Sequence, residues 1–561
     1  MSLQPQSIGA VPEETARIAQ CAFPKGNFCL RLRDELGPLY NDQMFAPLFS
    51  MRGQPAESPW RLALVLVLQF AEGLTDRQAA DAVRGRIDWK YLLGLTLDDP
   101  GFDASVLCEF RARILAGSLE EQFLDVLLNI CKARGLLKGR GMQRTDSTHV
   151  LAAIRVVTRL ELVGETIRAA LNSLSVVAPE WLQAHVVPEW FDRYSHRVES
   201  YRLPKQPEAC RQLAVTIGQD GSQLLSAISD PATPPWLRQV PAVEVLRRVW
   251  IQQYIIEDGQ LRWRKSEELP PGSRLICSPY DIEARYSKKR TTAWTGYKVH
   301  LTETCDPEQP HLITQVETTL ATTPDGAVVG VIQQSLAARE LLPAEHLMDT
   351  GYVDAEVLVT SQEQHGVVVC GPVPPDTTWQ KRAGEGFDLA CFTVDWEAEQ
   401  VRCPHGKTST QWLTHQDRHG NQCISVRFAK ADCQTCPVKV ACTKGENMGR
   451  QLGLRPRAQF EALQAARTRQ ATEEFKQHYA LRAGIEGTIS QGVRIGELRR
   501  SRYRGQAKTH LQHVLMAVAL NLGRLAVWWQ EQSEGPLRSI RPPRFATLAH
   551  SVQSVGLAGA A

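Results

Sequence analysis

Residues 471–494 have the sequence ATEEFKQHYALRAGIEGTISQGVR, and the expected fold is organised around this stretch. At helical period, steps of three and four place six residues on one stripe: Phe475, Tyr479, Arg482, Glu486, Ile489 and Val493. An exposed Arg–Glu pair in an isolated helix adds only about 0.2–0.5 kcal/mol. Gly484, Gly487 and Gly492 would each cost such a helix about 1 kcal/mol relative to alanine. The stripe therefore predicts a helix whose face meets both a core and a charged ligand.

Two segments gather positive charge. Residues 494–508 hold six Arg or Lys and one Glu, a net charge of +5 in a chain whose total is +3. Residues 285–298 hold five cations, no acid and three aromatic residues. Such segments suit a phosphate backbone and unstacked bases, although a charge run is commonly just a solvated loop. The candidate contacts are Lys288, Lys289, Arg290, Trp294, Lys298, Arg494, Arg499, Arg500, Arg502 and Arg504.

Length and composition indicate a globular protein of several domains. The chain has 561 residues, 43% hydrophobic and 22% charged. The apolar runs Leu62–Ala71 and Val514–Trp529 contain polar residues and are too short to span a bilayer. The N-terminus lacks a basic start followed by an apolar stretch, so no signal peptide is expected. The fourteen cysteines are then expected to be reduced thiols and possible metal ligands.

The N-terminal part predicts a helical domain at 1–140. Pro59–Glu72 is apolar and ends before Gly73, and Thr75 with Gln78 forms a capping-box pattern that opens a short helix to Val83. Ile87–Leu93 and Ala104–Ala116, the second capped by Asp103, complete the helical cluster. Short helices around a glycine turn resemble a helix-turn-helix, a pattern that plain helical bundles share.

An α/β pattern begins at Gly141. Residues 141–153 predict a strand with Asp146 among small polar residues, where a lone aspartate is commonly a turn or cap residue. Later segments predict strands at Tyr297–Thr304, Leu312–Thr319, His346–Asp349 and Val367–Cys370, and helices at Ala327–Ala338 and Asp354–Gln364. This order is typical of a mostly parallel sheet, in which polar groups at strand ends face the ligand crevice. Asp349 is therefore a stronger functional candidate than Asp146.

Two insertions interrupt this pattern. Residues 153–270 have helical periodicity and no identifiable chemistry. Residues 373–470 contain Cys403 followed by Cys433, Cys436 and Cys442, a spacing that fits a tetrahedral zinc site. The fourth ligand stays open, since other candidates lie nearby in sequence: Cys423, His405, His415 and His419. The alternative is a set of small buried thiols.

Several motifs together resemble the bacterial insertion-sequence transposases of the DDE type, from about Leu30 to Gln530. Residues 66–95 resemble the helical N-terminal domain common in these enzymes, and residues 144–150, 280–306 and 346–354 resemble successive core strands of one subgroup that also carries a cysteine-rich insertion. Tyr479, Arg482 and Glu486 match a Tyr-x2-Arg-x3-Glu-x6-Lys signature. Its lysine position is Val493 here, with Arg494 one residue later.

The resemblance implies a ribonuclease-H-like mixed sheet core in which Asp146, Asp349 and Glu486 converge as catalytic metal ligands. It implies two Mg²⁺ or Mn²⁺ ions, which prefer carboxylate oxygens and stabilise both oxygens of a phosphoryl transfer. Tyr479 and Arg482 would contact the phosphate near the cut end. Trp294 would either stack on a base displaced from the duplex or serve as a core anchor.

The expected activity is DNA cleavage at terminal inverted repeats and joining to target DNA by a cytoplasmic, nucleoid-associated homodimer. The alternatives are a metal-dependent nuclease without strand transfer and an inactive transposase-derived DNA-binding protein. The expected parts are a DNA-binding domain at 1–140, catalytic core at 141–372 and 471–535 with the helical insertion at 153–270, a zinc insertion at 373–470 and a loosely ordered tail at 536–561.

Overall fold

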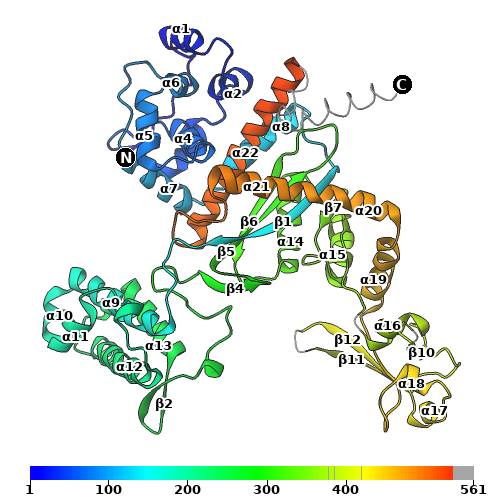
Figure 1. Cartoon of the computed structure of the whole chain (residues 1–561). Helices are drawn as coiled ribbons and strands as arrows, with labels where there is room; N and C mark the ends of the chain where they lie inside the picture. Colours follow the sequence, from blue (N-terminus) through cyan, green and yellow to red (C-terminus); the bar gives the residue numbers. More distant parts are fainter. Residues whose placement is uncertain (377, 385, 418–419, 535–561) are drawn as a thin grey trace, which may run out of the picture.

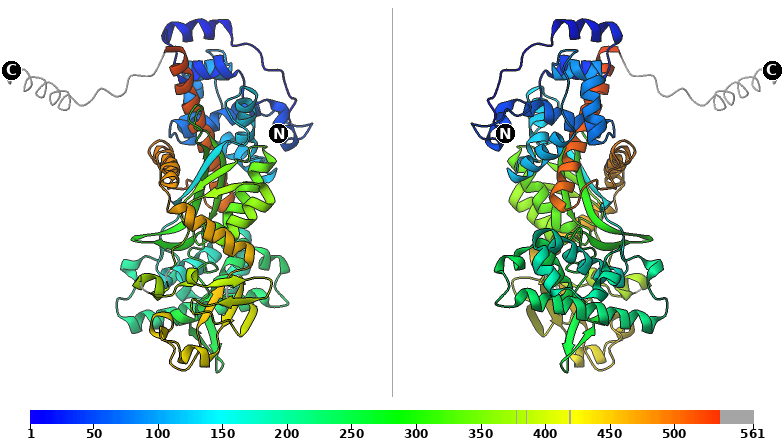
Figure 2. Two further views of the ribbon diagram at one scale, coloured as in Figure 1. Left: turned by 90° about the vertical axis from the view of Figure 1, so that its right-hand side faces the viewer. Right: turned by 90° about the vertical axis from the view of Figure 1, so that its left-hand side faces the viewer.

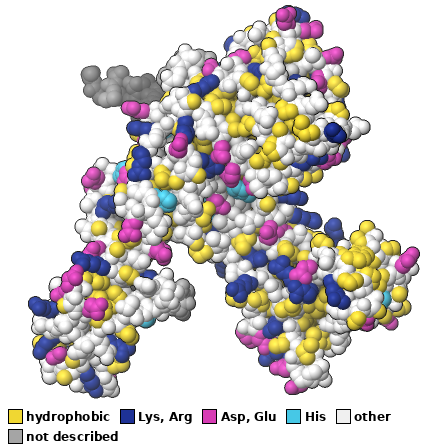
Figure 3. All heavy atoms as spheres, turned by 180° about the vertical axis from the view of Figure 1, so that it is seen from behind, with side chains coloured by type: hydrophobic (Ala, Val, Ile, Leu, Met, Phe, Trp, Pro, Cys, Tyr) yellow, Lys and Arg dark blue, Asp and Glu magenta, His cyan; other side chains and the backbone are white. Residues whose placement is uncertain are grey.

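The computed structural model describes residues 1–376, 378–384, 386–417 and 420–534 (Figure 1). The expected tail and His419 lie outside the described residues. Helices near the N-terminus occupy one end of the molecule and two insertions project from the other, as the side views of Figure 2 show. From behind, the insertions form two separate lobes (Figure 3).

The N-terminal part is helical, as predicted. Its elements are α1 (Glu13–Ala22), α2 (Phe28–Leu36), α3 (Asp42–Phe45), η1 (Ala46–Leu48), α4 (Pro59–Ala71), α5 (Asp76–Gly85), α6 (Ile87–Leu93), α7 (Ser105–Ala116) and α8 (Gln122–Ala133). The capping box at the start of α5 is confirmed, because Thr75 and Gln78 exchange side-chain and backbone hydrogen bonds. The N-cap of α7 is Ala104 and not Asp103 as predicted, although the Asp103 carboxylate accepts from the Ser105 amide at 2.9 Å.

The central sheet is mixed. Its strands are β1 (Met142–Leu151), β4 (Arg285–Lys289), β5 (Thr292–Thr304), β6 (Ile313–Leu320), β7 (Glu345–Met348) and β8 (Val368–Cys370). The order is β4-β5-β1-β7-β8, with β6 also paired to β5. Strands β1, β7 and β8 run parallel, whereas β5 is antiparallel to β1, β4 and β6. The mostly parallel arrangement predicted from element order is thus wrong for half of the sheet, because β4, β5 and β6 follow one another through short antiparallel connections.

Residues 471–494 do not form one helix but fall in α20 (Glu473–Ala480), η7 (Leu481–Ala483) and α21 (Gly484–Gly496). The predicted continuous helix tightens at η7, where the Leu481 carbonyl accepts a hydrogen bond from Arg144 at 2.5 Å. Phe475 and Ile489 are buried on the predicted stripe. Helices α14 (Val329–Ala338), with η5 (Gly326–Val328) before it, and α15 (Ala355–His365) complete the core.

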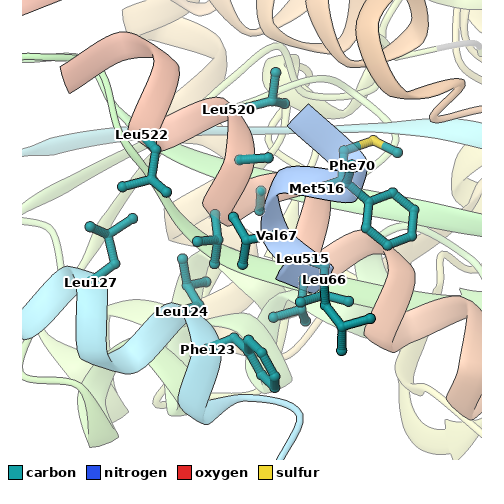
Figure 4. Close-up of a cluster of buried hydrophobic side chains, with 14 of the residues drawn as sticks. Leu66, Val67, Phe70, Phe123, Leu124, Leu127, Leu515, Met516, Leu520 and Leu522 are labelled. Atoms are coloured by element: carbon teal, nitrogen blue, oxygen red, sulfur yellow. The ribbon is translucent and has the colours of Figure 1, made fainter. Parts of the chain in front are cut away.

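Helix α22 (Gln506–Glu534) joins the sheet to the N-terminal helices. Figure 4 shows its Leu515, Met516, Leu520 and Leu522 meeting side chains of α4 and α8. By length and composition this helix could cross a membrane, yet 78% of its apolar window is buried inside the protein. The apolar surface of α22 is therefore explained by its packing in the core.

Each insertion has a hydrophobic cluster of its own. The first contains α9 (Arg159–Val177), α10 (Pro179–His185), α11 (Pro188–Tyr194), η2 (Ser200–Arg202), α12 (Pro207–Ser229), η3 (Pro235–Gln239), α13 (Pro241–Gln253), β2 (Tyr254–Glu257), β3 (Gln260–Trp263) and η4 (Ser266–Glu268). The hairpin β2–β3 was not predicted. The second contains α16 (Trp379–Ala383), η6 (Leu389–Cys391), β9 (Thr393–Asp395), β10 (Gln400–Arg402), β11 (Gln411–Gln416), β12 (Gln422–Arg427), α17 (Lys430–Gln434), α18 (Lys439–Cys442), β13 (Gln451–Leu454) and α19 (Arg457–Gln470).

Candidate active site

Asp146, within β1, and Asp349, directly after the last residue of β7, lie at the same level of the sheet. Thr145 on β1 pairs with Met348 on the parallel strand β7, and each aspartate is the next residue along. Adjacent strands lie about 4.8 Å apart, and equal positions along parallel strands point to the same face. The register therefore places the two carboxylates side by side on one face of the sheet.

Arg482 links this pair to the third acid. Its Nη2 donates to Asp146 Oδ2 at 2.5 Å and its Nη1 donates to Glu486 Oε1 at 2.9 Å. The side chains of Arg482 and Asp146 are 12% and 13% exposed, whereas that of Glu486 is 64% exposed. We refer to Asp146, Asp349, Arg482 and Glu486 as the acidic site. The site is buried at Arg482 and Asp146 and exposed to solvent at Glu486.

The electrostatics of the site reflect this crowding. Burial raises the pKa of Asp146, with a further upward contribution from Asp349, and these outweigh the lowering effect of Arg482. Burial also lowers the pKa of Arg482, but Asp146, Tyr479, Glu486 and Asp349 together shift that pKa upward overall. Tyr479 has a raised pKa, mainly through burial. A cation is thus held at the centre of the acids, and Tyr479 lies within the same electrostatic environment.

The turn after β7, which carries Asp349, is held by a hydrogen bond and by close packing. The Asp349 carboxylate accepts from the Gly351 amide at 2.8 Å. A Cβ on Gly351 would lie 3.0 Å from Asp349 Oδ1 and 3.3 Å from Asp325 Oδ2, so the turn favours glycine. The next residue, Tyr352, is 1% exposed, and its hydroxyl lies 2.6 Å from Nδ1 of the buried His300. This buried pair supports the turn that carries Asp349.

A second ionic cluster lies on the other side of α21. Glu303, fully buried on β5, accepts from Arg144 at 2.8 Å, from Thr488 at 2.6 Å and from Arg524 at 2.7 Å. Arg144 in turn donates to the Leu481 carbonyl of η7. We refer to Arg144, Glu303, Thr488 and Arg524 as the anchoring network. It ties β1, β5, α21 and α22 together. Sequence analysis missed it, and no local motif marks it.

The candidate DNA-contacting residues divide into two groups. Several are exposed: Lys288, Lys289, Arg290, Arg494, Arg499, Arg500 and Arg504. The segment after α21 runs along the end of β1, where Arg499 O accepts from the Leu151 amide and Arg499 Nε donates to Thr148 at 2.9 Å. The exposed Arg499 therefore lies close to the strand that carries Asp146.

The other candidates are engaged inside the protein. Arg502 donates to the Leu74 carbonyl at 2.6 Å and lies over the Phe70 ring, which ties it to the N-terminal helices. Lys298 pairs with Asp325 at 2.8 Å. Trp294 is 5% exposed and donates to the Tyr297 carbonyl at 3.0 Å. Of its two alternatives, this conformation has Trp294 as a core anchor.

The four cysteines predicted to bind zinc line one pocket. It is formed by Cys403, Cys433, Cys436 and Cys442 together with His405. The three other thiols contribute to the raised pKa of Cys442, for which burial is the largest cause. Within the described chain, however, no three of these sulfur atoms lie within 4.8 Å of one another. His415 pairs across the β11–β12 hairpin with Cys423, and neither lines the pocket.

Two family models match the sequence. A transposase domain family (DUF772) matches residues 18–113, and the transposase DDE domain matches residues 402–526. The second match includes the four cysteines and Tyr479, Arg482 and Glu486, and it begins after Asp349. No curated protein gives a significant match.

Proposed function

Because the chain belongs to the insertion-sequence DDE transposases, we propose that it binds the terminal inverted repeats of its element, cleaves there and joins the ends to target DNA. The observation that carries this proposal is the grouping of Asp146, Asp349 and Glu486 around Arg482, from three distant parts of the chain. Structural carboxylates rarely gather in this way without a cation to neutralise them.

The donor set fits two divalent cations. Asp146, Asp349 and Glu486 offer only carboxylate oxygens, which Mg²⁺ and Mn²⁺ prefer. The raised pKa of Asp146 reflects burial beside a second acid, an environment that a bound cation would relieve. When bound, such ions supply charge stabilisation for the attacking and leaving oxygens. Arg482 is placed to bind a phosphate of the strand end while it holds two of the acids in position.

A ribonuclease-H-like core is the proposed architecture of the catalytic part. Three antiparallel neighbours, β6, β5 and β1, continue into the parallel strands β7 and β8, and this strand order supports the proposal. The proposed parts keep the expected boundaries: a DNA-binding domain at 1–140, core segments at 141–372 and 471–535, and a zinc insertion at 373–470. A homodimer in the cytoplasm is the proposed working form.

The exposed cations suggest the course of the DNA. The β4–β5 hairpin presents Lys288, Lys289 and Arg290, and Lys289 is near enough to the acidic site to lower the pKa of Asp146. Arg494, Arg499 and Arg500 extend positive charge along α21 and the end of β1. We place the phosphate backbone across these two groups of cations, next to the exposed Glu486.

The cysteine pocket is the proposed structural zinc site. Thiolate ligands suit Zn²⁺, and the pocket holds four of them with His405 as an alternative fourth ligand. Zinc would draw the thiols closer, since ligand sulfurs bind at about 2.3 Å from the metal. Elemental analysis of the purified protein tests this, and a folded protein without zinc would contradict it.

The decisive experiment uses oligonucleotide duplexes that carry the ends of the element. Asp349→Asn should abolish Mg²⁺-dependent cleavage while duplex binding stays measurable, and Asp192→Asn, an exposed aspartate in the helical insertion, serves as the matched control. A labelled target duplex in the same reaction reports strand transfer. Cleavage without any joined product would favour the nuclease alternative, and no cleavage by the wild type would favour an inactive DNA-binding protein.

Salt dependence tests the proposed DNA course. Each phosphate contact removed should flatten the slope of log affinity against log salt by about 0.9 on duplex DNA. Arg499→Gln and Arg500→Gln should each do so. Arg502→Gln is the matched control, because its guanidinium is bound to Leu74 and should affect stability rather than the slope. Equal slopes in all three variants would remove 499–500 from the interface.

A further inference from the structure

A mixed cluster of ligand-type side chains lies outside both sites described above. Ligand atoms of Glu345, Cys370 and His478 all lie within 4.8 Å of one another. His478 Nε2 and Glu345 Oε2 are 2.8 Å apart. Among the described residues, this is the one group of three or more His, Cys, Asp or Glu side chains that meets so closely.

The chemistry of the three donors is selective. Imidazole, thiolate and carboxylate together suit Zn²⁺, whereas Mg²⁺ and Ca²⁺ prefer oxygen ligands alone. Three protein ligands leave a fourth tetrahedral position for water. Cys370 is buried, and Glu345 and His478 are each about one-third exposed at 30%, so the cluster is open to a metal from one side.

The cluster lies where the chain leaves the central sheet for the cysteine-rich insertion and where it returns. Cys370 is the last residue of β8, where the chain leaves the core for the cysteine-rich insertion. The chain returns through α20, which carries His478, and Glu345 is the first residue of β7. A metal bound by all three residues would hold the two ends of the inserted segment together. Bringing the ends of a long loop together costs entropy, and a metal that binds both ends can offset this cost.

The same helix leads directly into the acidic site. Tyr479 follows His478, stacks on Phe475 at 5.6 Å and is influenced by Asp146 and Asp349. Arg482 lies one helical turn further on. Fastening α20 to β7 and β8 would therefore hold the segment that leads to Arg482 in place against the sheet.

We propose that Glu345, Cys370 and His478 form a zinc site that fastens the returning end of the cysteine-rich insertion to the central sheet. On binding, Zn²⁺ takes the place of the proton between His478 Nε2 and Glu345 Oε2, which moves to Nδ1 or to solvent, and it displaces the proton of the Cys370 thiol to solvent. The proposal is independent of DNA cleavage, because its readout is metal content.

The test is elemental analysis of the full-length protein after loading with Zn²⁺ and passage over a chelating resin. Cys370→Ser, His478→Ala and Glu345→Gln should each lower zinc content by one equivalent per chain relative to wild type. Cys21→Ser and His196→Ala, both exposed and distant in the fold, should retain the wild-type content. Cys436→Ser should lose the zinc of the insertion and keep the equivalent bound here.

The Glu345→Gln variant separates loss of the metal from loss of the fold. Glutamine keeps the shape of the side chain, and its amide oxygen can still accept a hydrogen bond from His478. Its zinc affinity, measured by competition with a chromophoric chelator, should fall at least about tenfold. Wild-type zinc content and affinity in folded Glu345→Gln and His478→Ala proteins would overturn the proposal and leave the cluster as an ion pair beside a cysteine. A Cys436→Ser protein that retains no zinc would overturn it as well.

Discussion

Helix α21 has two different sides, and both connect it to β1. On one side lies the acidic site, in which the 64%-exposed Glu486 is held by a single guanidinium from Arg482. On the other lies the anchoring network, in which the fully buried Glu303 accepts from three side chains. Arg482 reaches from η7 to Asp146 on β1, and Arg144 reaches from β1 back to Leu481 on η7.

The anchoring network and the acidic site should therefore differ in how much each contributes to stability. Buried ion pairs are costly to form and very costly to break, because the remaining charge is left unpaired. Exposed pairs contribute about 0–1 kcal/mol. A helix fixed by the anchoring network can therefore present an acid such as Glu486 to solvent without needing that acid for its own stability.

The largest expected effect is on activity at the acidic site. Glu486→Gln should reduce Mg²⁺-dependent cleavage of element-end DNA by about a thousandfold or more, as removal of a catalytic group does. Its free energy of unfolding should stay within about 0.5 kcal/mol of wild type, because the side chain is exposed. Single-turnover cleavage and urea unfolding measure the two. Glu474→Gln, an exposed acid on α20, is the control, and equal cleavage by both variants would remove Glu486 from catalysis.

Breaking the anchoring network should give the opposite result in unfolding experiments. Glu303→Ala leaves Arg144 and Arg524 buried without their acid, so the free energy of unfolding should fall by about 3–5 kcal/mol. Urea unfolding followed by tryptophan fluorescence measures this. A Glu303→Ala protein as stable as wild type would mean that packing alone positions α21.

Sequence patterns predicted much of the local structure and little of the network. Thr75 and Gln78 form the expected capping box because its chemistry is contained within one helical turn. The sequence also predicted a strand around Asp146 and a strand that ends near Asp349, and the parallel register then sets the two carboxylates together. Glu303 has no such local signature, since its partners come from β1, α21 and α22.

The candidate cations show the same limit. Arg500 and Arg502 occupy one charged run, yet the first is exposed and the second is bound to Leu74. Lys298 belongs to the cationic segment but pairs with Asp325. Which member of a charge run faces solvent depends on tertiary packing, which neither net charge nor spacing encodes. The cluster of Glu345, Cys370 and His478 is likewise a product of the sheet register and the return of α20.

The buried His300, which contacts Tyr352 in the turn that carries Asp349, should make the stability of the protein depend on pH. Burial lowers the pKa of His300 from 6.5 to about 4, with Asp325 opposing and Lys298 and Lys289 adding smaller effects. Below pH 6.5 the unfolded chain binds a proton that folded His300 does not, so stability is lost as pH falls, by up to about 1.4 kcal/mol per pH unit.

His300→Gln should lack this part of the pH dependence. The stability advantage of wild type over the variant should therefore be larger at pH 7 than near pH 4.5, measured by urea unfolding at each pH. Other buried histidines contribute equally to both proteins and cancel. A constant difference across this range would mean that His300 titrates alike in the folded and unfolded chains.

The smallest expected effects on stability come from two glycines of α21, only one of which lies against the anchoring network. A Cβ on Gly484 would lie 2.1 Å from Arg144 Nη1, whereas a Cβ on Gly487 would have nothing within 4 Å. Alanine is favoured over glycine in a helix by about 1 kcal/mol. Gly487→Ala should therefore stabilise the protein by about that amount. In Gly484→Ala the gain is opposed by displacement of a guanidinium that Glu303 holds, an overpacking cost of about 1–3 kcal/mol. Measured by urea unfolding, the free energy of unfolding of Gly487→Ala should therefore exceed that of Gly484→Ala by about 1 kcal/mol or more. Equal stabilisation by both would show that Arg144 can yield, and that the anchoring network is softer than its burial indicates.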